Sequence, residues 1–183
     1  MLNAAALFAW WGLFNWIPTY LGSPVSEGGA GLSVVSTSTW IVLMQGGMWL
    51  GYLTFGFVAD TLGRRPAYVG YLTAAAILVP IYGMTRAPTL LLLLGPLVAF
   101  FGTGHFSGFG AVTAELFPTA IRATAQGFTY NVGRIAAAVA PFAVGSLAGD
   151  YGLGFAFFLT AAAFLVAALI ALALPETKGQ ALA

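Results

Sequence analysis

Six long apolar segments, separated by short breaks, constrain this chain more than any other feature. They run over residues 2–21, 34–58, 67–84, 89–114, 124–147 and 155–174. A helix needs about 20 apolar residues to cross the hydrocarbon core of a bilayer. Membrane-spanning β-strands would be about half as long and would alternate apolar and polar residues. The sequence therefore predicts an all-α integral membrane protein, with six transmembrane helices in one domain over residues 1–183.

The composition agrees with a membrane protein and excludes several other classes. Only 6% of the residues are charged and 60% are hydrophobic, which leaves too little charge for the surface of a soluble domain. The net charge of +1 gives no basic patch for nucleic acid. The chain has no Cys, which excludes disulfides and Cys-ligated metal sites. The lipid bilayer is thus the first partner predicted, with no metal and no nucleic acid.

The basic residues of the short breaks predict the orientation. Arg64, Arg65, Arg122 and Lys178 fall on one side of the six predicted spans, and Arg86 falls on the other. Short cytoplasmic loops carry an excess of Lys and Arg. We therefore expect both termini to lie in the cytoplasm, with the chain in the plasma (inner) membrane.

The break between the second and third segments carries the most specific pattern, Gly56-Phe57-Val58-Ala59-Asp60-Thr61-Leu62-Gly63-Arg64-Arg65-Pro66. We call it the signature turn. Gly56 allows two helices to approach closely, and Gly63 permits the reversal of a very short loop. Asp60 lies at a helix end, and Arg64 and Arg65 favour the cytoplasmic face. On these residues alone, a turn that only fixes topology and carries an incidental acid remains an alternative.

The signature turn resembles the G-x-L-a-D-r-x-G-R-[RK] loop of the major facilitator superfamily. Two further matches follow in the right order: Glu115, Pro118 and Arg122 resemble its E-x-x-P-x-x-x-R motif, and Pro175-Glu176-Thr177-Lys178-Gly179 resembles the tail of sugar porters and related metabolite:proton symporters. Thr61 departs from the motif, which has a basic residue there.

Superfamily members have twelve helices in two halves, and this chain matches the second. The resemblance therefore implies one half of a major facilitator fold, with the N-terminal half missing. We expect a truncated or broken reading frame, or a chain that pairs with a second copy or a separate N-terminal half.

The resemblance also implies a role for the charges at the breaks. In the family they form a cluster that holds the helices in one alternating state. By analogy, Asp60, Arg64, Arg65, Glu115 and Arg122 are predicted to be gating residues. A network of this kind can bias a nearly balanced equilibrium, although single exposed ion pairs contribute only about 0–1 kcal/mol. The alternative is that these residues only fix topology.

An arginine near mid-membrane is the leading candidate for substrate binding. Arg134 lies twelve residues beyond Arg122, which is about 18 Å along a helix. Tyr130 and Asn131 share its helix face, so the three are predicted to line a cavity. Gly133-Arg134-Ile135 before Pro141 resembles the eleventh helix of organic-acid transporters, which suggests an anionic substrate paired with Arg134. A structural arginine that pairs with an acid of the absent half is the alternative.

Three further polar residues lie inside the predicted spans. His105 lies ten residues before Glu115, at a depth similar to that of Arg134, and is a candidate for proton coupling because imidazole titrates near neutral pH. Asn15 and Gln45 could contact substrate. Each of the three could instead only form hydrogen bonds between helices.

The sequence therefore predicts a secondary active transporter half, with proton-coupled uptake of an organic acid or a sugar-like metabolite. It shows no nucleophile–base pair and no phosphate-binding loop, so neither an enzyme nor a cofactor is expected. Two alternatives remain open: a non-transporting membrane assembly or regulatory subunit, and half of a drug-type exporter.

Overall fold

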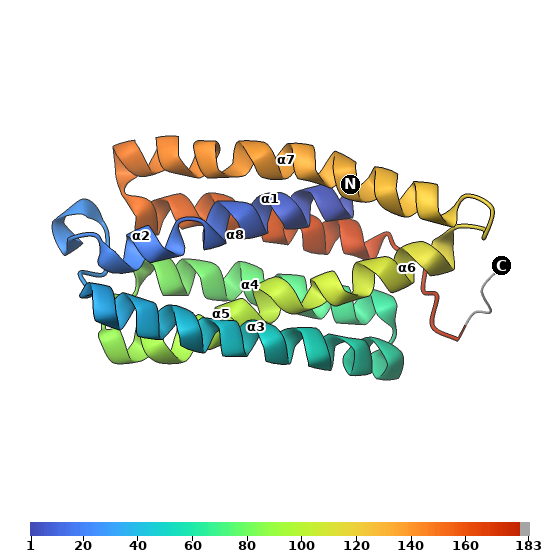
Figure 1. Ribbon diagram of the computed structural model, residues 1–183, viewed down its shortest axis with the longest axis horizontal. Coiled ribbons are helices and arrows are strands. Elements are labelled where there is room, and N and C mark those ends of the chain that lie inside the picture. Colours follow the sequence, from blue (N-terminus) through green and yellow to red (C-terminus); the bar gives the residue numbers. More distant parts are fainter. Residues whose placement is uncertain (180–183) are drawn as a thin grey trace.

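The protein is a bundle of helices that run along one long axis, as the computed structural model shows (Figure 1). The structure describes residues 1–179, and no strand occurs among them. The α-helices are α1 (Leu2–Phe14), α2 (Ile17–Gly22), α3 (Val34–Leu62), α4 (Arg64–Met84), α5 (Pro88–Gly104), α6 (Phe109–Leu116), α7 (Arg122–Tyr151) and α8 (Leu153–Leu172). Short 3-10 helices are η1 (Val25–Glu27) and η2 (His105–Gly108), and η2 joins α5 to α6. The predicted all-α class is confirmed.

Five helical stretches are long and apolar enough to cross a membrane within the described part of the chain. They are α3, α4, the α5–η2–α6 unit, α7 and α8. The first predicted span, residues 2–21, differs because it is broken into α1 and α2 at Asn15 and Trp16. Pro18 lacks the N–H that would bond the Phe14 carbonyl in a continuous helix, which accounts for the break. α1 and α2 still follow one another along the bundle (Figure 1).

The signature turn is tighter than the sequence suggested. α3 continues through Asp60 to Leu62 and α4 starts at Arg64, so that Gly63 alone separates the two helices. Gly63 has a φ of 109°, which a residue with a side chain rarely adopts. The reversal therefore places the charged residues of both helix ends beside one another.

The helices differ in how much of their surface the bundle covers. α4 packs mainly on α8, α3 on α5, and α1 on α7 and α8. Within an apolar stretch of 18 residues, 22% of the residues of α3 and of α7 are buried inside the bundle. The corresponding share is 44% in each of the other three membrane-length stretches. α3 and α7 therefore present broad apolar faces, which suits contact with lipid or with another membrane domain.

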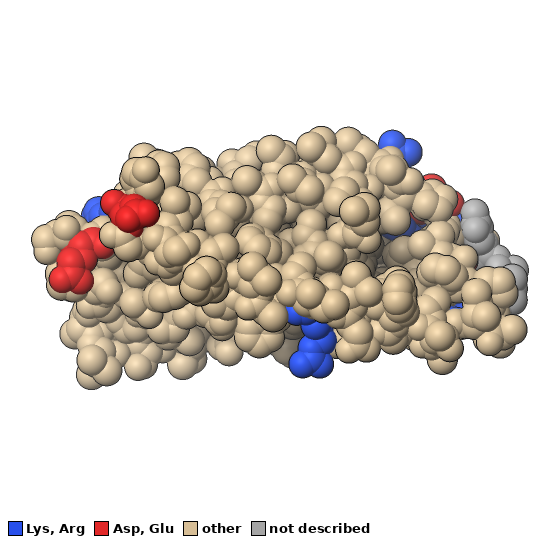
Figure 2. Space-filling model, turned by 90° about the horizontal axis from the view of Figure 1, so that it is seen from above, with Lys and Arg blue, Asp and Glu red and all other residues tan. Residues whose placement is uncertain are grey.

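On the face shown in Figure 2, charged side chains gather at both ends of the bundle. The exception is a group of basic atoms near the middle of that face. We call the end with the signature turn, the α6–α7 turn and residues 173–179 the tail end. The other, with residues 23–33 and the α4–α5 turn, is the loop end. In Figure 1 the tail end is on the right and the loop end on the left.

Candidate functional site: a charge network and polar groups within the bundle

The charge network at the tail end is centred on Arg64, the first residue of α4. Its guanidinium forms an ion pair with Asp60 of α3 and a second one, at 2.8 Å, with Glu115 of α6. Nε of Arg64 also lies 3.2 Å from each carboxylate oxygen of Glu115. The Glu115 side chain is only 12% exposed, and that of Arg64 16%. Three helices are thus joined through one guanidinium, whose fork geometry suits carboxylates.

Residues 176–178 complete this network, and the sequence interpretation did not give them a role in it. The Glu176 carboxylate accepts hydrogen bonds from the backbone N–H groups of Arg64 at 2.8 Å and Arg65 at 3.1 Å, so it caps the start of α4. The Thr177 hydroxyl donates to Glu115 at 2.5 Å, and Lys178 Nζ donates to the Thr61 carbonyl at 2.5 Å. The Pro-Glu-Thr-Lys motif was the signal that could have identified this contact.

The environment of Glu176 affects its ionisation. Partial desolvation alone would raise the pKa of its carboxyl group, but the hydrogen bonds from the backbone N–H groups of Arg64, Lys178, Arg65 and Thr177 stabilise the charged form. The net result is a pKa below the usual value for Glu. Glu176 is therefore ionised at neutral pH and places a negative charge at the positive end of the α4 dipole.

The other predicted gating residues lie at the same end and make different contacts. Arg122 Nε donates to the carbonyls of Ala114 at 3.0 Å and Phe117 at 3.3 Å, and so ties the start of α7 to the end of α6. Pro118 accepts from Ile121 N–H at 3.1 Å in the turn between them. Arg65 is exposed. Gly56 lies within α3, and a side chain there would meet open space.

Two of the predicted substrate residues line one small cavity near the break between α1 and α2. Asn15 and Gln45 both border this cavity of about 200 Å³, together with Trp10, which the prediction omitted. Trp10 is held in place by a 3.0 Å hydrogen bond from its indole N–H to the Thr103 hydroxyl. The cavity therefore combines an aromatic wall with two amide side chains, which can both donate and accept hydrogen bonds.

The remaining predicted substrate residues lie on the exposed side of α7. Arg134, Tyr130 and Asn131 are all exposed, and the Arg134 guanidinium lies 6.0 Å from the centre of the Tyr130 ring. Asn131 donates to the Gly127 carbonyl at 2.8 Å within its own helix. Among residues 1–179, no acidic side chain forms an ion pair with Arg134.

Arg134 and the small cavity lie at different depths. The Trp16 indole, next to Asn15, donates to the carbonyl of Pro141 at 2.9 Å. Pro141 follows Arg134 by seven residues, or about 10 Å along α7. The structure thus brings Asn15 and Gln45 together, and Tyr130 and Arg134 together, as two separate pairs.

His105 is fully buried where the α5–η2–α6 unit tightens into a 3-10 turn. Its Nδ1 lies 3.4 Å from the Phe101 carbonyl, and its Nε2 has no hydrogen-bond partner. The imidazole is surrounded by the rings of Tyr68, Phe106, Phe109 and Phe164. His105 is therefore separated from solvent, in a segment whose 3-10 geometry often marks a hinge.

Arg86, predicted only as an orientation signal, has a structural role at the loop end. It donates to the Tyr20 hydroxyl at 2.8 Å and to the Gly83 carbonyl at 3.1 Å. The Tyr20 hydroxyl in turn lies 2.7 Å from the carbonyl oxygen of Thr85. These contacts hold α2 against the turn between α4 and α5.

The fold is that of one half of a membrane transporter. A solved structure of the peptide transporter POT, a mutant in complex with alafosfalin, superposes with a TM-score of 0.78 at 19% identity, over 97% of this chain and 39% of the transporter. A model of the Major Facilitator Superfamily matches residues 1–182. The chain belongs to the Major Facilitator Superfamily, whose members are transporters and not enzymes. It is an integral membrane protein.

Two relatives with transport functions match most of this chain. The cis,cis-muconate transport protein of Acinetobacter baylyi is 34% identical over 163 residues, which are 89% of this chain and 38% of that protein. The sialic acid transporter NanX of Escherichia coli is 28% identical over 156 residues, or 84% of this chain and 37% of that protein. The chain thus spans less than half the length of these relatives.

Proposed function

We propose that this chain is the C-terminal half of a proton-coupled transporter that takes up a small organic acid. The observation that carries the proposal is Arg134, an exposed cation in the middle of α7 with no acid partner among residues 1–179. An intramembrane charge is costly unless it faces water, a ligand or a counter-ion. The names of the two relatives, which specify muconate and sialic acid, agree with an anionic substrate.

The transport path would lie between this bundle and an N-terminal half. The exposed apolar faces of α3 and α7 suit such a partner, and Arg134 lies on α7. The Asn15–Gln45 cavity would bind polar groups of the substrate farther along the path, because it lies near the level of Pro141, which is about 10 Å along the α7 axis from Arg134. A second copy of this chain is the other arrangement that could close the path.

The binding test uses cis,cis-muconate as the probe. We would co-express the chain with the N-terminal half of the Acinetobacter muconate transporter and measure uptake into proteoliposomes under an inward proton gradient. Arg134→Ala is expected to reduce uptake at least tenfold, because it removes the cation that attracts the substrate carboxylate. Arg134→Lys is expected to retain part of the uptake, because lysine keeps the positive charge. Arg86→Ala serves as the control at the loop end. Equal uptake by wild type and Arg134→Ala would overturn the substrate role.

His105 is the proposed proton-coupling residue. Its unpartnered Nε2 and its place in the 3-10 turn of η2 support a group that gains access to protons only when the helices rearrange. We expect His105→Gln to lose gradient-driven accumulation and to retain exchange of labelled for unlabelled muconate, since exchange requires no net proton movement. Gradient-driven accumulation by His105→Gln at the wild-type level would exclude this role.

The network around Arg64 is the proposed gate, with both termini in the cytoplasm. Asp60, Glu115 and the tail would hold α3, α4 and α6 together in one state and release them in the other. The orientation can be tested because the chain has no Cys. A membrane-impermeant maleimide added outside cells should label Ser26→Cys at the loop end and leave Ala120→Cys at the tail end unlabelled. The reverse pattern would contradict the orientation.

A further inference from the structure

Two buried polar groups lie next to each other inside the bundle, and neither has a hydrogen-bond partner. They are Nε2 of His105 and the hydroxyl of Tyr68, and both side chains are fully buried. The centres of the two rings are 6.4 Å apart. Burying a polar group without a hydrogen bond costs free energy. Two such groups side by side therefore point to a function or to a second conformation in which they are satisfied.

Gly108 places the Tyr68 hydroxyl beside the turn that contains His105. His105 and Gly108 are the first and last residues of η2, and residues three apart in a 3-10 helix lie one above the other. The first carbon of a side chain at Gly108 would lie 2.8 Å from the Tyr68 hydroxyl oxygen. The ring of Phe109 packs on both Tyr68 and His105. The hydroxyl therefore lies over the face of η2 that carries the imidazole.

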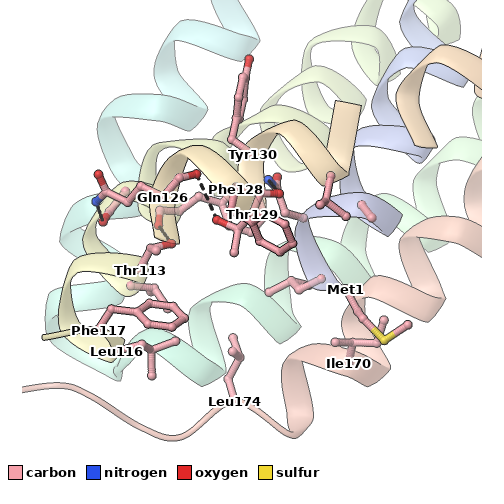
Figure 3. Close-up of a pocket in the computed structure, with 17 residues that line it drawn as sticks. Met1, Thr113, Leu116, Phe117, Gln126, Phe128, Thr129, Tyr130, Ile170 and Leu174 are labelled. Carbon is pink, nitrogen blue, oxygen red and sulfur yellow. Dashed lines mark hydrogen bonds between the residues drawn. The ribbon is translucent and has the colours of Figure 1, made fainter. Parts of the chain in front are cut away.

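The other hydroxyl groups between residues 99 and 116 already have hydrogen-bond partners. They belong to Thr103, Ser107 and Thr113. Thr113, which is labelled in Figure 3, donates to the Phe109 carbonyl at 2.7 Å within α6. No charged side chain among residues 1–179 forms an ion pair with His105. Of the four rings that surround the imidazole, only that of Tyr68 carries a hydroxyl.

A hydroxyl at this place suits both protonation states of His105. In the neutral imidazole, Nδ1 can donate to the Phe101 carbonyl, which is 3.4 Å away, and Nε2 is then an acceptor. In the imidazolium both ring nitrogens donate, so Nε2 needs an oxygen. The Tyr68 hydroxyl can donate to the first form and accept from the second. Because a hydrogen bond to a charged group is about twice as strong, the hydroxyl favours the protonated form.

We propose that Tyr68 is a positioning residue for proton coupling, whose hydroxyl accepts a hydrogen bond from Nε2 of protonated His105. The bond forms when η2 rearranges, since a 3-10 segment can act as a hinge. The proton stays on Nε2, so Tyr68 keeps its own proton. Tyr68 follows Arg64 by one turn of α4, and the charges of Arg64 and Glu115 act on its hydroxyl. The bond would thus connect proton uptake with the proposed gate, and the proposal rests on the proposed coupling role of His105.

The test follows the protonation of His105 by NMR. His105 is the single histidine of the chain, so isotope-labelled histidine gives one imidazole to titrate in the purified protein in detergent. We expect Tyr68→Phe to reduce the proton affinity of this imidazole at least tenfold, because the imidazolium loses its acceptor. Gly108→Ala should act in the same direction, because the added carbon displaces the hydroxyl without removing it. The two variants alter different elements, so the test survives if one of them fails to fold.

Two matched variants are the controls. Tyr71→Phe removes another hydroxyl of α4, which lies 3.1 Å from the Thr54 hydroxyl. Gly110→Ala adds a carbon to α6 at a position where it meets open space. Both variants should titrate like the wild type. In the muconate uptake assay, Tyr68→Phe should need a more acidic outside buffer for half-maximal accumulation and should retain exchange. A purely structural loss would lower uptake without this shift in the pH profile.

Equal titration of His105 in wild type and Tyr68→Phe would overturn the proposal and leave the coupling role of His105 in place. If wild-type His105 takes up no proton before the protein unfolds in acid, both the coupling role and the role of Tyr68 are wrong. The two failures are therefore distinguishable. Neither result bears on Arg134, whose substrate role has its own test.

Discussion

At the tail end Arg64 donates to the carboxylates of Asp60 and Glu115, whereas at the loop end Arg86 donates to the hydroxyl of Tyr20 and the carbonyl of Gly83. Both arginines connect segments that are far apart in the sequence. Only the tail end, however, uses formal charges on both partners, and its Glu115 is largely buried. Contacts at the tail end should therefore weaken when either carboxylate is protonated or removed, whereas the acceptors at the loop end are neutral and carry no carboxylate to protonate.

The largest expected difference between the ends comes from removing each arginine. Arg64→Ala should lower the free energy of unfolding by about 3 kcal/mol, because it leaves the largely buried Glu115 without its cation. Arg86→Ala should cost less than about 1 kcal/mol, because Arg86 is exposed and its acceptors are neutral. SDS unfolding in mixed micelles measures both values.

A double-mutant cycle sharpens this result. If the Arg64–Glu115 pair carries the effect, Arg64→Ala combined with Glu115→Ala should cost clearly less than the sum of the two single changes. Additive losses, or equal losses for Arg64→Ala and Arg86→Ala, would break the contrast between the ends.

A smaller effect is expected from the neutral contacts of the loop end. Tyr20→Phe removes the hydroxyl that accepts from Arg86 and lies beside the Thr85 carbonyl, and should cost about 1 kcal/mol. The loss should depend little on salt, because the contact between the Arg86 cation and the neutral Tyr20 hydroxyl joins a charge to a dipole rather than two charges. Tyr52→Phe, at an exposed position of α3, is the matched control and should change little. If the loss of unfolding free energy in Tyr20→Phe vanished in high salt, the loop-end contacts would be held mainly by interactions between charges.

The sequence predicted the general features of the fold better than its details. Continuous apolar segments were enough to predict a helical membrane bundle, because backbone groups in lipid must form their hydrogen bonds internally. The break at Asn15 and Trp16 was missed, because hydropathy does not register the N–H that Pro18 lacks. Residues 60–66 were expected to form a turn, but both helices extend into this segment and leave only Gly63 between them.

The site was predictable where a motif carried it and less so where packing decided it. Asp60, Arg64 and Glu115 meet as their motifs suggested. That Asn15 and Gln45 share a cavity with Trp10 depends on the packing of α1 and α2 against α3, which no local pattern specifies. Helical spacing placed Tyr130 and Arg134 on one face, yet it could not show that this face is exposed. The functional roles of these residues remain predictions.

The smallest expected effect concerns the cap that the tail places on α4. Glu176→Gln should cost about 0.5 kcal/mol at pH 7, because an exposed carboxylate at a helix start contributes modestly. The pKa of Glu176 is lower in the folded protein than its usual value, so this contribution is present at neutral pH and is lost as the pH falls through the folded pKa. The difference in unfolding free energy between wild type and Glu176→Gln should therefore shrink as the pH falls below the usual range for Glu, and it should disappear once the Glu176 carboxyl group is protonated in the folded protein. Glu27→Gln, in η1 at the loop end, is the control. A difference that persists unchanged at low pH would mean that Glu176 acts through packing rather than through charge.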